Sequence, residues 1–157
     1  MKIFILLIMS GLLIIGCNQN PEHSTVHDMD SRVVQTDSTI RDGVFIHITE
    51  SYNDPHRVLM PLKMATIMAD DHDVLVYMDI HAVELLVKGS KDMTYEGFES
   101  AQTYIKQLID KKVGVYACPT CLKIAGFNPE DLMDGVQAAM KEKFFSFTKG
   151  RILTLDY

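Results

Sequence analysis

The sequence lacks an excess of positive charge and lacks the common motifs for nucleotide binding. Fifteen Lys and Arg residues face 21 Asp and Glu residues, for a formal net charge of −6 at pH 7. This balance argues against nucleic-acid binding, which needs a basic face, and against a polybasic attachment to anionic lipid. No internal repeat and no Gly-rich phosphate loop is visible. The sequence also offers no acid–base pair for hydrolysis, and we expect no organic cofactor and no metal site.

Long hydrophobic runs are also scarce, and the one that exists is short. Residues 3–15 form an apolar run after Lys2, which is shorter than the ~20 residues needed to span a bilayer and is typical of a signal peptide. The run leads into Ile14-Ile15-Gly16-Cys17, which resembles the bacterial lipobox. We therefore expect cleavage before Cys17 and lipid attachment to it. An ordinary signal peptide with an incidental cysteine is the alternative, but its usual small-residue cleavage site is hard to find here.

Behind this leader, the chain has length for one domain with one core. Residues 1–17 are predicted to be the lipoprotein signal peptide. Residues 18–42 are polar and rich in Ser, Thr, Asp, Asn and Gln, which predicts a flexible tether in which His23 and His27 are solvated linker residues rather than metal ligands. Residues 43–157 form the domain. It is expected in the periplasm or at the cell exterior, held to a membrane through lipid on Cys17.

Within the domain, short apolar runs alternate with helical patterns. Strands are predicted at residues 44–49, 73–79, 113–117 and 151–157. Helices are predicted at residues 55–69, 82–88, 100–109, after residue 118 up to Gly126, and from Asn128 through Ala139. Pro61 either kinks the first helix or marks its start. The alternation predicts an α/β fold: a single three-layer domain with a mostly parallel sheet of four to five strands and helices on both faces.

Cysteine is rare, and two of its three copies, Cys118 and Cys121, lie three positions apart. Cys118 ends a predicted strand and enters a helix, where free backbone N–H groups favour a thiolate, and Pro119 suits a first helical turn. Lys123 could add positive potential. A low-pKa thiol with Cys121 one turn away can attack sulfur and then be released as a disulfide. Half of a metal site and a structural disulfide remain alternatives, although zinc wants four ligands and so small a loop stabilises little.

Three segments together resemble the DsrE/DsrF-like family. They are residues 116–126 (Tyr-Ala-Cys-Pro-Thr-Cys-Leu-Lys-Ile-Ala-Gly), residues 54–57 (Asp-Pro-His-Arg) after the first strand, and the closing residues 147–157. The resemblance implies a small parallel α/β sheet, homo-oligomers, and persulfide sulfur carried on a cysteine after the third strand, here Cys118. Cys121 departs from many single-cysteine carriers, so a persulfide carrier and a disulfide-exchanging protein both stay open. The family's known sulfur relays are cytoplasmic, so the expected lipid anchor argues against a role in tRNA thiolation.

Four further polar residues lie near predicted strand ends. His81 follows the second strand and could serve Cys118 as a base or a metal ligand, although a half-exposed loop histidine is an equal alternative. His56 and Arg57 could bind a sulfur oxyanion at a helix start, against the more ordinary reading as solvent-facing residues. His47 lies inside a buried strand and is expected to be a hydrogen-bonded core residue.

The sequence thus predicts a membrane-anchored protein with thiol chemistry at Cys118 and Cys121. It would be either a sulfurtransferase-like carrier or a thiol oxidoreductase, acting on small sulfur species or on a thiol protein partner and assembling as a homo-oligomer. Met60, Met64 and Met68 share one helical face, which leaves a module for copper or another soft metal as an alternative, although methionine commonly fills cores. A non-catalytic oligomeric interaction domain is the other alternative.

Overall fold

The structure is a computed structural model that describes residues 40–157. Cys17, His23 and His27 lie outside the described residues, so the predicted lipid anchor and most of the predicted tether stay predictions. Within residues 40–157, no helix is both long enough and apolar enough to cross a membrane.

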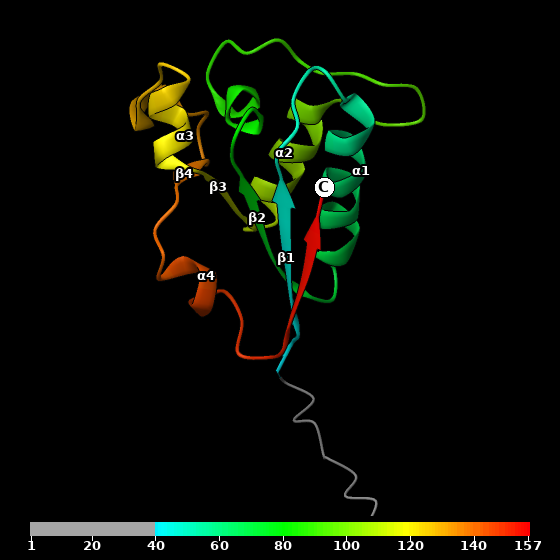
Figure 1. Cartoon of the computed structure of the whole chain (residues 1–157). Helices are drawn as coiled ribbons and strands as arrows, with labels where there is room; N and C mark the ends of the chain where they lie inside the picture. The colour runs from blue at the N-terminus through cyan, green and yellow to red at the C-terminus, as the bar shows by residue number, and fades with distance from the viewer. Residues whose placement is uncertain (1–39) are drawn as a thin grey trace, which may run out of the picture. The chain divides into compact units, whose positions relative to one another are not determined.

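Five parallel strands form one sheet, as Figure 1 shows. They are β1 (Gly43–Ile48), β2 (Asp73–Met78), β3 (Gly114–Ala117), β4 (Gln137–Ala138) and β5 (Ile152–Asp156), in the spatial order β4-β3-β2-β1-β5. Every pairing is parallel. The predicted α/β fold with a mostly parallel sheet is therefore confirmed. Because the strands are parallel, their carboxyl ends meet at one edge of the sheet and their amino ends at the other.

One face of the sheet carries the hydrophobic core. Alternate residues of the strands point to it, since successive side chains of a strand face opposite sides. This face is covered by α1 (Pro55–Met68) and α2 (Ala101–Asp110), which contact β1 and β3. The side chains buried in this layer are Val44, Ile46, Ile48, Val74, Val76, Met78, Val115, Ala117, Val58, Leu59, Leu62, Ala65, Tyr104, Ile105 and Leu108.

The first helix begins at Pro55, as the sequence predicts. Its capping residue Asp54 accepts a hydrogen bond from the Arg57 backbone N–H at 3.2 Å, and Pro55 needs no partner in the first turn. Pro61 lies inside the helix and is buried against the sheet. Because the helix runs from Pro55 to Met68 with Pro61 inside it, the alternative in which Pro61 starts the helix is wrong. Pro61 has no backbone N–H to donate, and its ring packs in the core.

The other face of the sheet is covered more thinly, by α4 (Lys143–Ser146). Phe144 of this helix lies edge-on to Phe45 and Tyr77, with ring centroids 5.6 and 5.1 Å apart. Beyond these aromatic contacts the face carries polar groups from the strands, including His47. The second face therefore carries polar side chains that the aliphatic face lacks.

The region after β3 differs in part from expectation. The predicted stop at Gly126 is confirmed: α3 (Pro119–Ile124) ends there, with Gly126 at φ +86°. The predicted short helix at residues 82–88 is a 3₁₀ helix, η1 (Ala82–Leu86).

The helix predicted from Asn128 to Ala139 is wrong. Only one 3₁₀ turn forms, η2 (Pro129–Asp131). The chain then pairs with the end of η1, since the Met133 backbone N–H donates to the Leu86 carbonyl at 2.9 Å. Gly135 at φ +88° turns the chain into β4. These contacts with a distant segment outweigh the local helical signal.

Candidate thiol site

Cys118 lies at the junction between β3 and α3. Its backbone N–H donates to the Met78 carbonyl of the neighbouring strand at 2.9 Å, and its carbonyl accepts from the Leu122 N–H at 2.9 Å. Its φ of −63° and ψ of 118° are extended, so the residue caps the helix that follows. The sheet and the first turn of α3 thus fix the thiol at the carboxyl end of a central strand, where sequence analysis placed it. The thiol is partly exposed.

The surroundings of Cys118 favour its thiolate. Burial raises the pKa of this thiol, but hydrogen bonds from the Tyr77 hydroxyl, the Cys121 backbone and thiol, and the Thr120 backbone lower it, and the net pKa is lowered. Donors aimed at the sulfur stabilise its charged form directly. A lowered pKa increases the fraction of thiolate at neutral pH, and the thiolate is the form that attacks sulfur.

Cys121 has the opposite character. Burial raises its pKa, and the hydrogen bond and charge of Cys118 raise it further, against one lowering contact from the Ile80 backbone N–H. Both cysteines are free thiols. The pair is therefore asymmetric: its surroundings lower the pKa of Cys118 and raise the pKa of Cys121.

Tyr77 supplies the side-chain donor to Cys118. Burial is the main cause that raises the pKa of its hydroxyl, and the neighbouring Cys118 raises it further, so the hydroxyl stays a proton donor. The ring is held by Phe144 on one side and by His47, whose ring stacks at 5.4 Å and 27°. Sequence reasoning missed Tyr77, because nothing local shows that it pairs in register with Tyr116, two residues before Cys118.

His47 is bracketed by two carboxylates. Its Nδ1 lies 2.8 Å from Asp156 Oδ1 in a hydrogen bond. Its Nε2 lies 3.0 Å from Asp79 Oδ1, and both atoms are buried, yet this contact is an ion pair without hydrogen-bond alignment. Burial lowers the pKa of His47, but the two carboxylates outweigh it and the net pKa is raised. The expected hydrogen bond of His47 is confirmed, but the residue is partly exposed on the second face of the sheet and is not a core residue.

Ile80 has a backbone conformation that β-branched residues rarely adopt. Its φ is +48°, in the left-handed region. The carbonyl of Thr49 accepts from the N–H groups of His81 and Ala82 at 3.2 Å, which holds the turn. The Ile80 N–H meanwhile hydrogen-bonds to Cys121. A strained turn that aims a backbone donor at a thiol is typical of a functional site.

A cavity of about 410 Å³ opens beside Cys121. Its rim is apolar and accessible, since Ile124 is 81% exposed and Ile80 is 54% exposed. The predicted supporting residue His81 lies in this cavity with Cys121, whereas Lys123 is exposed on α3 and does not line it. The residues that line the cavity are Ile80, His81, Glu84, Cys121, Ile124 and Ala125.

The other predicted supporting residues lie elsewhere. The His56 ring stacks with Tyr95 at 5.7 Å and contacts Phe98 at 5.4 Å, in the loop before α2. Arg57 is exposed on the first turn of α1. Within residues 40–157 no hydrogen bond or ion pair joins either residue to the thiols, so the structure does not bring them to this site.

The methionines of the metal alternative lie on α1. Met60, Met64 and Met68 are partly buried, and Met68 packs against the core. In the part of the chain that the structure describes, no group of three or more His, Cys, Asp or Glu side chains is placed to hold a metal ion. The thiol pair by itself supplies two ligands.

Together these features define a class: a small parallel α/β domain with an asymmetric thiol pair at the carboxyl end of a central strand. Residues 42–145, more than half of the chain, match the DsrE/DsrF-like family. The protein belongs to that family, as the resemblance of its motifs predicted.

Two solved structures share the fold. One is the crystal structure of the ychN protein from E. coli, with a TM-score of 0.59 and 21% identity over 73% of this chain and 99% of that one. The other is a protein of unknown function, MTH1491 from Methanobacterium thermoautotrophicum, with a TM-score of 0.54 and 20% identity over 72% of this chain and 98% of that one. No curated protein matches the sequence.

Proposed function

We propose that this protein performs sulfur chemistry at Cys118, with Cys121 as the resolving thiol. The observation that carries the proposal is the asymmetry of the pair: contacts of Tyr77 and two backbone N–H groups lower the pKa of the first thiol, while burial raises the pKa of the second. Membership of a family with sulfur-relay members is compatible with this role. Both thiols are partly exposed, and Cys121 lines an open cavity, which supports access of a sulfur substrate to the pair.

The reaction follows from the roles of the two thiols. The Cys118 thiolate attacks the terminal sulfur of a donor persulfide R–S–SH; a new S–S bond forms on Cys118, the donor S–S bond breaks, and R–S⁻ leaves. Cys121 can then attack the Sγ of Cys118, which forms the Cys118–Cys121 disulfide and releases hydrosulfide. With a disulfide donor R–S–S–R′ the same two attacks release first R′–S⁻ and then R–S⁻. An external dithiol must then reduce the protein.

Tyr77 and the strained turn at Ile80 would support these steps. The tyrosine hydroxyl donates to the attacking sulfur and stays protonated, which stabilises charge on Cys118 before attack and after release. The Ile80 N–H donates to Cys121 and would stabilise that thiolate when it forms. We assign neither residue a proton-transfer step.

Intact mass spectrometry on three chains tests the chemistry. The chain is purified anaerobically, incubated with glutathione persulfide, and alkylated before analysis. In Cys121→Ser we expect one added sulfur atom on Cys118 that persists until a reductant is added, because no resolving thiol is present. In the parent chain the sulfur is replaced by a disulfide, and in the matched variant Cys118→Ser no sulfur is gained.

Two outcomes would contradict the proposal. Equal sulfur uptake by Cys118→Ser would show that the first thiol has no special role. Two unmodified thiols with a retained metal ion would favour the soft-metal alternative. A chain that re-forms its disulfide quickly but never holds added sulfur identifies disulfide exchange as the reaction.

We further propose that the chain is exported and held to a membrane by lipid on Cys17, on the strength of the lipobox-like residues 14–17. Membrane fractionation with mass analysis should give a chain that begins at an acylated Cys17. Cys17→Ser should abolish both the acyl mass and the cleavage. Recovery of an unmodified, uncleaved parent chain would overturn this part.

We also infer self-association, because α4 and the edge strand β5 each carry exposed apolar side chains. Phe145 is 79% exposed, and Ile152 and Leu153 are also exposed. Light scattering should give a mass above that of one chain, and a monomer at micromolar concentration would contradict the inference.

A further inference from the structure

A second cavity lies at the end of the sheet opposite the thiols. It has a volume of about 520 Å³, within the range of small-molecule sites. Asp73 and Gly114, the first residues of β2 and β3, line it. Lys112 joins them from the turn before β3 and Lys143 from α4. Since the thiols follow the carboxyl end of β3, this cavity is independent of the proposed thiol chemistry.

The lining of the cavity is cationic, although the chain is acidic overall. Asp73 is the one acidic residue in the lining, which also includes Arg41, His72, Lys111, Lys112 and Lys143. Lys111 is paired with Asp70, and His72 lies 2.6 Å from Asp71. Among residues 40–157, no carboxylate lies within ion-pair distance of Arg41, Lys112 or Lys143. Three unpaired cations against one carboxylate favour an anionic ligand.

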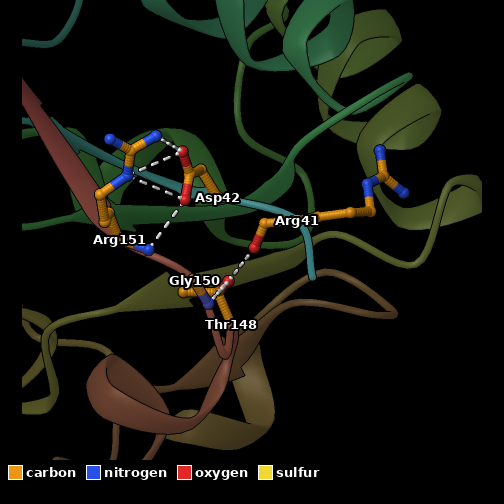
Figure 2. Close-up of polar contacts among 5 residues, drawn as sticks. All are labelled: Arg41, Asp42, Thr148, Gly150 and Arg151. Atoms are coloured by element: carbon orange, nitrogen blue, oxygen red, sulfur yellow. Dashed lines mark hydrogen bonds and ion pairs between the residues drawn. The ribbon is translucent and has the colours of Figure 1, made fainter. Parts of the chain in front are cut away.

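The backbone that carries Arg41 is clamped, as Figure 2 shows. The Arg41 carbonyl accepts a hydrogen bond from Thr148 Oγ1 at 2.7 Å. The adjacent Asp42 accepts from the Arg151 backbone N–H at 2.9 Å and pairs with its guanidinium at 2.6 Å. A Cβ added to Gly150 would collide with the Arg41 carbonyl oxygen. These contacts fix the position from which the Arg41 side chain departs.

The guanidinium of Arg41 is oriented and still has free donors. In Figure 2 its side chain extends away from the Asp42–Arg151 pair. Its Nε donates to the Asp71 backbone carbonyl at 2.9 Å, which leaves Nη1 and Nη2 without a carboxylate partner among the described residues. A planar guanidinium held in this way is suited to bind two oxygens of one oxyanion.

Neutral polar groups complete the lining. The Tyr116 ring lies against Gly114, where an added Cβ would come within 2.5 Å of the ring and 3.0 Å of the hydroxyl oxygen. The glycine therefore lets the tyrosine lie at the start of its own strand, and Gln137 lines the cavity beside it. Hydroxyl and amide groups add donors to those of the cations.

We propose that this cavity binds a phosphate-type oxyanion, with Arg41, Lys112 and Lys143 as its principal ligands. The anion is either a free phosphorylated solute or the headgroup of an anionic phospholipid. The headgroup source rests on the proposed lipid on Cys17, which would keep the domain close to a membrane surface.

The first test is a titration of residues 18–157, without acyl chains, with inorganic phosphate at constant ionic strength set with chloride. Backbone amide resonances of Gly114, Gly135 and Gln137 report on the cavity. We expect saturable shifts at these three positions and no comparable shift at Cys118. Shifts that grow linearly without saturation would overturn the proposal, because they would report screening alone.

Two double variants with the same change in charge sharpen the test. Lys112→Gln/Lys143→Gln removes two proposed ligands, and we expect at least roughly tenfold weaker phosphate binding, since each hydrogen bond to a charged group is worth about 1.5 kcal/mol or more. Lys91→Gln/Lys106→Gln removes two exposed lysines that do not line the cavity. Equal weakening by both variants would overturn the site. Reactivity of Cys118 should be unchanged in both, which separates this proposal from the proposed function.

Vesicle flotation identifies the source of the anion. Binding to phosphatidylcholine vesicles that contain phosphatidylglycerol, lost in Lys112→Gln/Lys143→Gln and reduced by free phosphate, would assign the cavity to headgroups. Saturable phosphate binding without flotation would assign it to a soluble anion. The absence of both saturable phosphate binding and vesicle flotation would refute the proposal.

Discussion

The two faces of the sheet differ sharply, although the same strands make both. Residues Val44, Ile46 and Ile48 of β1 point to one face and are buried, and α1 packs against this strand. Phe45 and His47, between them, point to the other face, where one short helix and a polar cluster cover them. Because successive side chains of a strand point to opposite faces, one face of the sheet packs into the hydrophobic core and the other carries the titratable groups.

The same division holds around the thiols. Val115 and Ala117 of β3 belong to the core cluster, whereas Tyr116 lies outside it beside Tyr77, and Cys118 packs against the edge of the core while its thiol accepts a hydrogen bond from Tyr77. We therefore expect substitutions on the aliphatic face to change stability. Substitutions on the other face should change thiol reactivity or its pH dependence. Three predictions test this division, from the largest expected effect to the smallest.

Ile46→Ala should be the most destabilising of these changes. The side chain is fully buried, so its truncation leaves a cavity and should lower the free energy of unfolding by about 2–5 kcal/mol. Urea denaturation of the purified chain measures this. The control is Thr154→Ala on the exposed face of β5, which should stay within roughly 1 kcal/mol of the parent. Similar losses in both variants would break the comparison of the two faces.

Tyr77→Phe should act on reactivity rather than on the fold. Loss of the hydroxyl removes a hydrogen bond that lowers the pKa of Cys118, so the pKa of this thiol should rise. The rate of Cys118 alkylation near neutral pH should fall about tenfold, since such a bond to a charged group contributes about 1.5 kcal/mol. The pH profile of iodoacetamide alkylation in a Cys121→Ser background measures both effects. Tyr104→Phe, on the core side, is the matched control.

An unchanged alkylation profile in Tyr77→Phe would show that backbone donors alone stabilise the thiolate. The asymmetry of the thiol pair would then depend on the α3 junction and not on the polar face of the sheet.

His47→Gln should have the smallest effect, seen only in the pH dependence of stability. The folded-state pKa of His47 is raised above its unfolded value near 6.5, so the folded protein holds this proton more tightly. The stabilisation is fully present below pH about 6.5 and is lost as pH rises through the folded pKa. Its size should be below about 1 kcal/mol, because Asp156 is largely exposed and solvent screens the pair.

Urea denaturation across this pH window, for the parent and for His47→Gln, measures the difference. A Cys118→Ser background is needed, because the lowered pKa of that thiol contributes stability in the opposite direction, as pH rises. A steeper pH dependence in His47→Gln than in the parent would contradict the assignment of the two carboxylates to His47.

Most elements of the fold could be predicted because their signals are local. β-branched runs gave β1, β2 and β3 to within a few residues, and Gly126 correctly ended α3. The helix predicted from Asn128 failed because the competing contacts, such as Met133 with Leu86, come from a distant segment. A capping signature shows where a helix can start and does not show how far tertiary contacts will let it continue.

The candidate site was only partly predictable for the same reason. Cys118 and Cys121 were found from their spacing and from the strand before them. His81 lines the cavity beside Cys121, since the carboxyl ends of parallel strands meet, but its expected role towards Cys118 stays a prediction. His56 and Arg57 were placed at a strand end too, but His56 stacks against Tyr95 and Phe98, and Arg57 is exposed. Tyr77 and Ile80 were missed, because strand register and a left-handed turn leave no local mark.

The sequence by itself determined the class of the fold and the family, and it singled out Cys118 and Cys121 as candidate thiols, because each of these depends on residue type and short spacing. The acidic net charge also follows from the sequence, but its distribution does not. Only the tertiary structure brought Tyr77 to Cys118, placed His47 between two carboxylates, and gathered Arg41, Lys112 and Lys143 around one cavity. Those groups are far apart along the chain. Their meeting depends on strand order and register, which long-range packing decides.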